Sequence, residues 1–84
     1  QTILVKLLLS TRAYQLLIEE FSDARPFISH ETDQDKKHHR FVYEARSLIG
    51  IGRFILGLPG EIVVESPVEL KDYLKKRISE FALS

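Results

Sequence analysis

The final third of the chain, residues 54–81, constrains the fold more than any other stretch. Its sequence, FILGLPGEIVVESPVELKDYLKKRISEF, reads as the end of a helix, a turn, a short β-branched strand and a second helix. The segment Ser66-Pro67-Val68-Glu69 has the residue types of a capping box, so we expect Ser66 to cap the last helix and Pro67 to occupy its first position. Helical spacing predicts that this helix buries one stripe, formed by Leu70, Leu74, Ile78 and Phe81.

The rest of the chain supplies further strands and helices that alternate in a recognisable order. We predict a strand at 2–9, a helix at 12–21 capped by Ser10 or Thr11, strands at 27–32 and 39–46 around a polar loop, a helix at 48–58 capped by Ser47, and a strand at 61–65. The order β-α-β-β-α-β matches the ferredoxin-like arrangement. The predicted fold is therefore α+β, a four-stranded antiparallel sheet with two helices on one face and an additional C-terminal helix.

Length and charge limit the class of protein. Eighty-four residues make a single domain, 1–84. Twelve basic and twelve acidic residues cancel, which argues against a dedicated nucleic-acid binder, because phosphate contacts require a basic excess. The chain has no cysteine and no apolar run of membrane-spanning length, so we expect a cytoplasmic protein without membrane contact. Because the first residue is Gln, we expect a fragment of a longer protein.

No arrangement of residues predicts a catalytic, cofactor or metal site. The serines are better explained as helix caps than as nucleophiles. His30, His38 and His39 lie in or beside the polar loop, where a metal site is less expected than a solvated loop tip, because adjacent histidines in a strand point to opposite faces. Gly50-Ile51-Gly52 lacks the third glycine of a nucleotide-binding loop. The two glycines are instead expected to allow close packing against the sheet.

RNA binding of the kind seen in RNA-recognition motifs is also not expected. Such domains stack bases on exposed aromatic side chains of two sheet strands. Phe41 and Tyr43 share the predicted core face, and the first strand has no aromatic residue.

The open side of the predicted sheet carries apolar residues that the core does not account for. Period-two geometry places part of the first strand and part of the strand at 39–46 on the open side of the sheet. We expect an apolar patch rimmed by charge there, and such a patch is typical of a covered surface. The cover is expected to be the last helix, a partner subunit or a missing domain. The candidate interface residues are Leu4, Lys6, Leu8, Arg40, Val42 and Glu44.

Residues 54–70 resemble the C-terminal end of bacterial WYL-domain transcriptional regulators. In that family a helix of the type W-I-L-S-L-G leads through a glycine turn to a short strand and then to E-P-x-x-L. Here the corresponding segments are FILGLPG (54–60), IVV (62–64) and SPVEL (66–70), and the strand at 40–46 is also similar. Phe54 replaces the common Trp, and the turn glycine follows Pro59. The element order is compatible over the whole chain.

The resemblance implies a C-terminal extension (WCX) domain with a ferredoxin-like fold that helps to dimerise or regulate the protein. DNA contacts would come only from an N-terminal helix-turn-helix absent from these residues. We therefore expect a non-enzymatic module that packs against a WYL domain or a second subunit. The alternative is a module that binds a small effector between the sheet and the terminal helix, and a small enzyme on the same fold is the least favoured.

Overall fold

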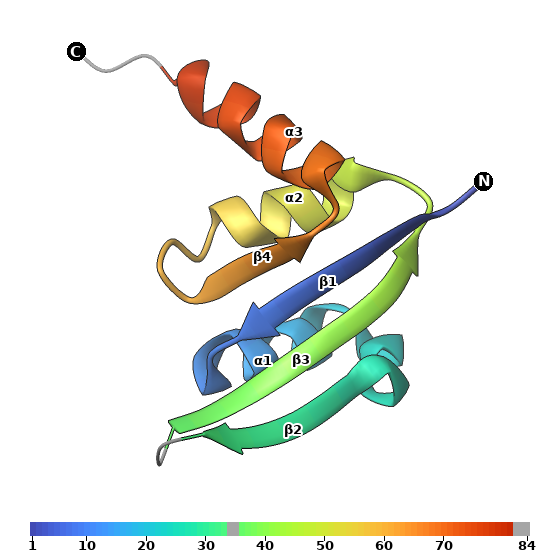
Figure 1. The fold of residues 1–84 in the computed structure, drawn as a ribbon, viewed down its shortest axis with the longest axis vertical. Helices are drawn as coiled ribbons and strands as arrows, with labels where there is room; N and C mark the ends of the chain where they lie inside the picture. Colours follow the sequence, from blue (N-terminus) through green and yellow to red (C-terminus); the bar gives the residue numbers. More distant parts are fainter. Residues whose placement is uncertain (34–35, 82–84) are drawn as a thin grey trace.

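The computed structural model describes residues 1–33 and 36–81, and for residues 32, 33, 36 and 37 it describes the backbone alone. Figure 1 shows a sheet with two helices behind it and a third helix beyond one edge. In chain order the elements are β1 (Ile3–Leu9), α1 (Thr11–Glu20), the 3-10 helix η1 (Ser22–Phe27), β2 (Ile28–Asp33), β3 (Lys36–Ala45), α2 (Leu48–Leu56), β4 (Ile62–Ser66) and α3 (Val68–Ser79).

The sheet has the strand order β2-β3-β1-β4, and every neighbouring pair is antiparallel. Because α1 and α2 both lie behind this sheet in Figure 1, the first six regular elements form the predicted ferredoxin-like arrangement. The α+β fold class is confirmed, and so is the additional C-terminal helix.

The core lies between the sheet and these two helices. The predicted alternation of β1 is confirmed, because Val5, Leu7 and Leu9 are buried while Leu4 and Lys6 are exposed. From the helix side, Ala13 and Leu17 of α1 pack toward the sheet. From α2 the packing residues are Ile51, Phe54 and Ile55.

Two of the three predicted serine caps are present. The Ser10 hydroxyl accepts a hydrogen bond from the backbone N–H of Ala13 at 3.0 Å. The Ser47 hydroxyl accepts one from the N–H of Ile49 at 3.1 Å. Each serine thereby satisfies one of the first-turn amides that a helix leaves without an internal partner.

The predicted capping box at the start of α3 is wrong. Ser66 is the last residue of β4 and pairs with Lys6 of β1. Pro67, with φ −89° and ψ 171°, is the N-cap residue, and no side chain caps this helix. Strand pairing extends the sheet one residue further than the local sequence indicates, so the serine hydroxyl is not placed over the first turn.

The region between α1 and β3 also differs from its prediction. Residues 22–27 form a 3-10 helix that includes Pro26, although no helix was predicted between the helix at 12–21 and the strand at 27–32. The expected polar loop is much shorter, because β2 and β3 stay paired as far as Asp33 and Lys36. In Figure 1 the β2–β3 hairpin extends past the helices that cover the sheet. Strands in such a region can pair through their backbones without apolar side chains.

Helix α3 packs against α2 and β4. Its apolar stripe is only half buried, because Leu70 and Leu74 are in the core whereas Ile78 is 55% and Phe81 62% exposed. The prediction of one continuous buried stripe is therefore wrong for its second half, which extends beyond the body of the domain (Figure 1).

Candidate interface on the open face of the sheet

The six candidate interface residues lie together on the sheet face opposite α1 and α2. They form three direct cross-strand pairs between β1 and β3: Leu4 with Glu44, Lys6 with Val42, and Leu8 with Arg40. Side chains of directly opposed residues in adjacent antiparallel strands contact one another. The alternation of β1 and β3 was sufficient to find this group.

The edge strands add three residues that the sequence reasoning did not include. Val63 of β4 pairs with Leu8. Glu65 of β4 and Glu31 of β2 approach Arg40 from opposite sides. The alternation in the IVVE segment could have placed Val63 and Glu65 on this face, but their proximity to Arg40 follows only from the strand order.

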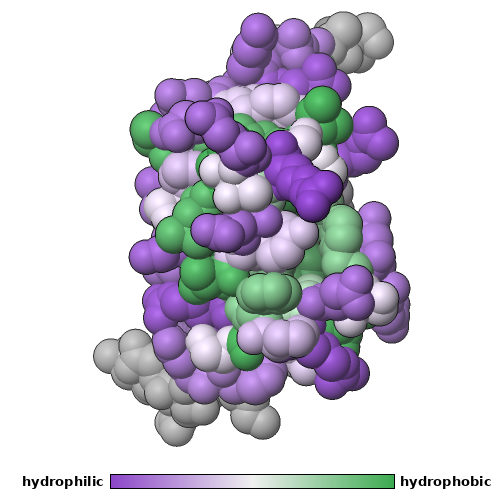
Figure 2. All heavy atoms as spheres, turned by 90° about the vertical axis from the view of Figure 1, so that its right-hand side faces the viewer, coloured by the Kyte–Doolittle hydropathy of each residue, from purple (hydrophilic) through white to green (hydrophobic). Residues whose placement is uncertain are grey.

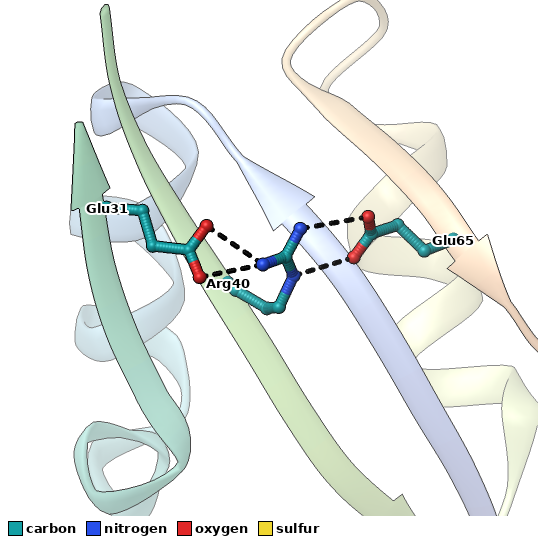
Figure 3. Close-up of polar contacts among 3 residues, drawn as sticks. All are labelled: Glu31, Arg40 and Glu65. Atoms are coloured by element: carbon teal, nitrogen blue, oxygen red, sulfur yellow. Dashed lines mark hydrogen bonds and ion pairs between the residues drawn. The ribbon is translucent and has the colours of Figure 1, made fainter. Parts of the chain in front are cut away.

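Arg40 connects three strands of the sheet. Its side chain leaves β3 and crosses over β1 toward β4, as Figure 3 shows. Its Nε and Nη2 donate to the two carboxylate oxygens of Glu65 at 2.9 and 3.1 Å. Its Nη1 donates to both oxygens of Glu31 at 2.7 and 2.8 Å. All three guanidinium nitrogens are therefore used, in the fork geometry that makes arginine–carboxylate pairs directional.

The ion pair shifts the pKa values of both Arg40 and Glu65. The hydrogen bond from Arg40 lowers the pKa of Glu65 below its ordinary value; desolvation opposes this shift, and the charges of Arg40 and Lys6 add to it. The hydrogen bond to Glu65 and the charge of Glu31 raise the pKa of Arg40. Both shifts favour the charged forms, a protonated Arg40 and an ionised Glu65.

Charge runs through the middle of this face. The sequence predicted an apolar patch with a charged rim, and that arrangement is wrong. Leu4, 47% exposed, lies nearer the start of β1, and Val63, 60% exposed, lies on β4 opposite Leu8, which is also the partner of Arg40. The two carboxylates leave one negative charge beside the guanidinium, and Lys6 offsets it.

None of the described helices covers this face. Helices α1 and α2 lie on the other side of the sheet, and α3 lies beyond β4 in Figure 1. Of the three covers that the sequence left open, the last helix is excluded for residues 68–81.

The histidines do not form a solvated loop tip. His30 and His39 are cross-strand partners on the helix side of the sheet, and His39 is only 7% exposed. Their Nδ1 atoms are 2.7 Å apart, and the Nε2 of His39 lies 3.2 Å from the Thr11 hydroxyl. His38 points to the opposite face, as predicted. In the part of the chain that the structure describes, no three His, Cys, Asp or Glu side chains form a group that could hold a metal ion.

A hollow of about 470 Å³ lies on the helix side of the sheet. It is lined by the end of α1, the start of η1, the end of β3 and the start of α2, with Leu17, Phe21, Phe41, Tyr43, Arg46 and Ile51 among its residues. The sequence placed a possible effector between the sheet and the terminal helix, but none of the residues that line this hollow belongs to α3.

The fold and the open sheet face define a ferredoxin-like domain with one uncovered surface. Comparison with protein families adds that the model of the WCX domain matches residues 1–82. The chain therefore belongs to the WCX domain family, the C-terminal extension domains of WYL-type transcriptional regulators. Comparisons with curated proteins and with solved structures found no match. Within residues 1–33 and 36–81, no helix is long and apolar enough to cross a membrane.

Proposed function

We propose that this domain is a non-enzymatic regulatory module whose open sheet face packs against another surface of its regulator. The surface would belong to the WYL domain or to a second subunit. Contacts with DNA would be made by an N-terminal domain outside these residues.

The observation that carries this proposal is the uncovered face with its two exposed apolar side chains. An antiparallel sheet can leave one face in water, but the exposed positions are then usually polar. Leu4 and Val63 instead remain exposed on the same face as an ordered ion-pair network. A partner that buried both Leu4 and Val63 would be stabilised by the hydrophobic effect. The fixed charges of the network would restrict the orientation in which that partner binds.

The test is the assembly of the intact regulator with Leu4→Glu on the open face. We expect sedimentation equilibrium to show self-association weakened by about tenfold or more, because the substitution places a charge where the partner would bury an apolar side chain. Ile49→Glu is the matched control, since Ile49 is 57% exposed on α2, away from this face. Val63→Glu repeats the test at a second position.

A second readout separates the two possible surfaces. If Leu4→Glu leaves self-association unchanged but makes the junction between the WYL and WCX domains easier to cleave with protease, the packing is within one chain. If neither property differs from that of the Ile49→Glu control, the open face is not a packing surface.

A second function, binding of a small effector, is favoured by the hollow between α1 and α2. Its volume lies within the range of about 300–1,000 Å³ that is typical of small-molecule sites. The hollow lies on the side of the sheet opposite the open face, so the two functions do not compete for the same residues.

A further inference from the structure

The hollow has an apolar base and aromatic walls. Buried side chains of α1, β3 and α2 form the base, namely Leu17, Phe41, Ala45 and Ile51. Phe21 and Tyr43 line its sides and are partly exposed to solvent. Figure 2 looks onto the side of the molecule where β3 ends and α2 begins, and it shows hydrophobic surface open between hydrophilic groups. This base suits the apolar body of a small molecule.

One side of the hollow is negative. Helix α1 ends there, and the carbonyl end of a helix carries partial negative charge. Its last turn has no basic residue to balance that charge. Glu20 and Asp23 add two carboxylates to the same side, and neither makes an ion pair with another described residue.

The other side of the hollow is positive. Helix α2 begins there, and the amide end of a helix carries partial positive charge. Its first turn has no acidic residue, and Ser47 accepts from only one of the first-turn amides. Arg46 adds a guanidinium that makes no ion pair within residues 1–33 and 36–81.

Helix α3 provides an internal comparison. It has Glu69 in its first turn and Lys76 and Arg77 in its last turn, which balance its ends in the usual way. The two helix ends at the hollow instead adjoin side chains of their own sign. Opposite uncompensated charges therefore face the same apolar space.

We propose that this hollow binds a small zwitterion with an apolar body, such as a hydrophobic amino acid or a short apolar peptide. The ammonium group lies toward Glu20 and Asp23, the carboxylate toward Arg46 and the start of α2, and the apolar body on the Phe41 side. The proposal deepens the effector-binding function and does not depend on the open sheet face.

The experiment compares three probes that share one ring. L-Phenylalanine carries both charges, 3-phenylpropanoate only the carboxylate, and phenethylamine only the ammonium. Amide chemical shifts of the ¹⁵N-labelled chain are followed during titration. We expect shifts around 46–50 and 20–24, with phenylalanine binding about tenfold more tightly than either single-charge analogue. L-Leucyl-L-phenylalanine distinguishes a peptide from a free amino acid.

Charge-specific variants identify which side binds which group. Arg46→Gln should weaken the binding of phenylalanine and of 3-phenylpropanoate by about tenfold and leave the binding of phenethylamine unchanged. The double variant Glu20→Gln/Asp23→Asn should instead weaken the binding of phenylalanine and of phenethylamine. Arg53→Gln is the matched control, because Arg53 is exposed on α2 but does not line the hollow.

Two outcomes would overturn the proposal. One is equal binding of all three probes, which would mean that the charges at the rim have no role. The other is an absence of shifts around the hollow at millimolar concentrations of phenylalanine and of the dipeptide, in a chain whose spectrum shows that it is folded. Neither outcome bears on the Leu4→Glu test, so failure here leaves the packing proposal intact.

Discussion

Gly50 and Gly52 stand two residues apart in α2 but have different surroundings. A Cβ atom on Gly50 would meet nothing within 4 Å, because the residue lines the hollow. A Cβ atom on Gly52 would lie 2.6 Å from Cε2 of Tyr73, on α3. The sequence predicted close packing for both glycines against the sheet. Close packing occurs only at Gly52, and the partner is the last helix.

The two glycine-to-alanine substitutions should therefore act in opposite directions. Gly50→Ala should raise the free energy of unfolding by about 1 kcal/mol, since alanine is the better helix former and finds open space. Gly52→Ala should lower it by up to about 2 kcal/mol, because the clash with Tyr73 outweighs that gain. Urea denaturation of both variants measures the difference. Effects of the same sign and size would contradict the tight contact between α2 and α3.

His39 is buried although its neighbours in the sequence are polar. It lies in a polar stretch, KKHHR, and local polarity indicated solvent exposure. The ring is instead buried, stacked on Tyr14 at a centroid distance of 4.5 Å. His39 is buried because β3 already includes this residue and places it beneath α1. The local sequence does not show which helix will cover the strand.

At the scale of elements, the three serines that precede helices have different roles. Ser10 and Ser47 follow strands that have already ended, so each hydroxyl can reach a first-turn amide. Ser66 is still paired within β4. The same residue type in the same local pattern is thus a cap in two places and a strand residue in the third.

Replacement of two of these serines should separate the two roles. Ser10→Ala should lower the free energy of unfolding by about 1 kcal/mol, because the amide of Ala13 loses its partner. Ser66→Ala should change it by less than about 0.5 kcal/mol, since its hydroxyl caps no helix. Thermal denaturation of the two variants is the measurement. An equal loss for both would mean that Ser66 caps α3 in solution.

At the scale of the whole molecule, β3 serves both sides of the sheet. Phe41, Tyr43 and Ala45 line the hollow beneath the helices. Arg40, Val42 and Glu44 alternate with them on the open face. Arg40 also links β3 to both edge strands through Glu31 and Glu65. An ordered ion-pair network of this kind contributes more than isolated surface pairs do.

The network should make stability depend on pH in a defined direction. The pKa of Glu65 is lowered in the folded protein, so its contribution is present above the pKa of the unfolded chain and is lost as the pH falls through the folded-state value. The Glu65→Gln variant lacks this contribution. It should therefore lose less stability than the native chain between about pH 7 and about pH 3.

Urea denaturation at both pH values measures that difference, and about 1 M NaCl should reduce it because the network is partly exposed. Glu44→Gln is the matched control on the same face, since Glu44 makes no ion pair with another described residue. If Glu65→Gln and Glu44→Gln have the same pH dependence, the Arg40 network does not contribute to folding.

The sequence by itself determined the order of the strands and α-helices, the buried face of β1, the caps of α1 and α2, and the WCX family. Each of these depends on residues close together in the chain, where alternation, capping chemistry and turn residues act locally. The open-face group from β1 and β3 was also predictable, because it needed only period-two geometry.

Only the tertiary structure decided which side chains from different strands and helices meet, and several features follow from that alone. The order β2-β3-β1-β4 brings Glu31 and Glu65 to Arg40, so charge lies across the open face and not only at its rim. The packing of α3 on α2 leaves that face uncovered. Such contacts join residues far apart in the chain, and their free energy depends on the packing of the whole domain rather than on any one segment.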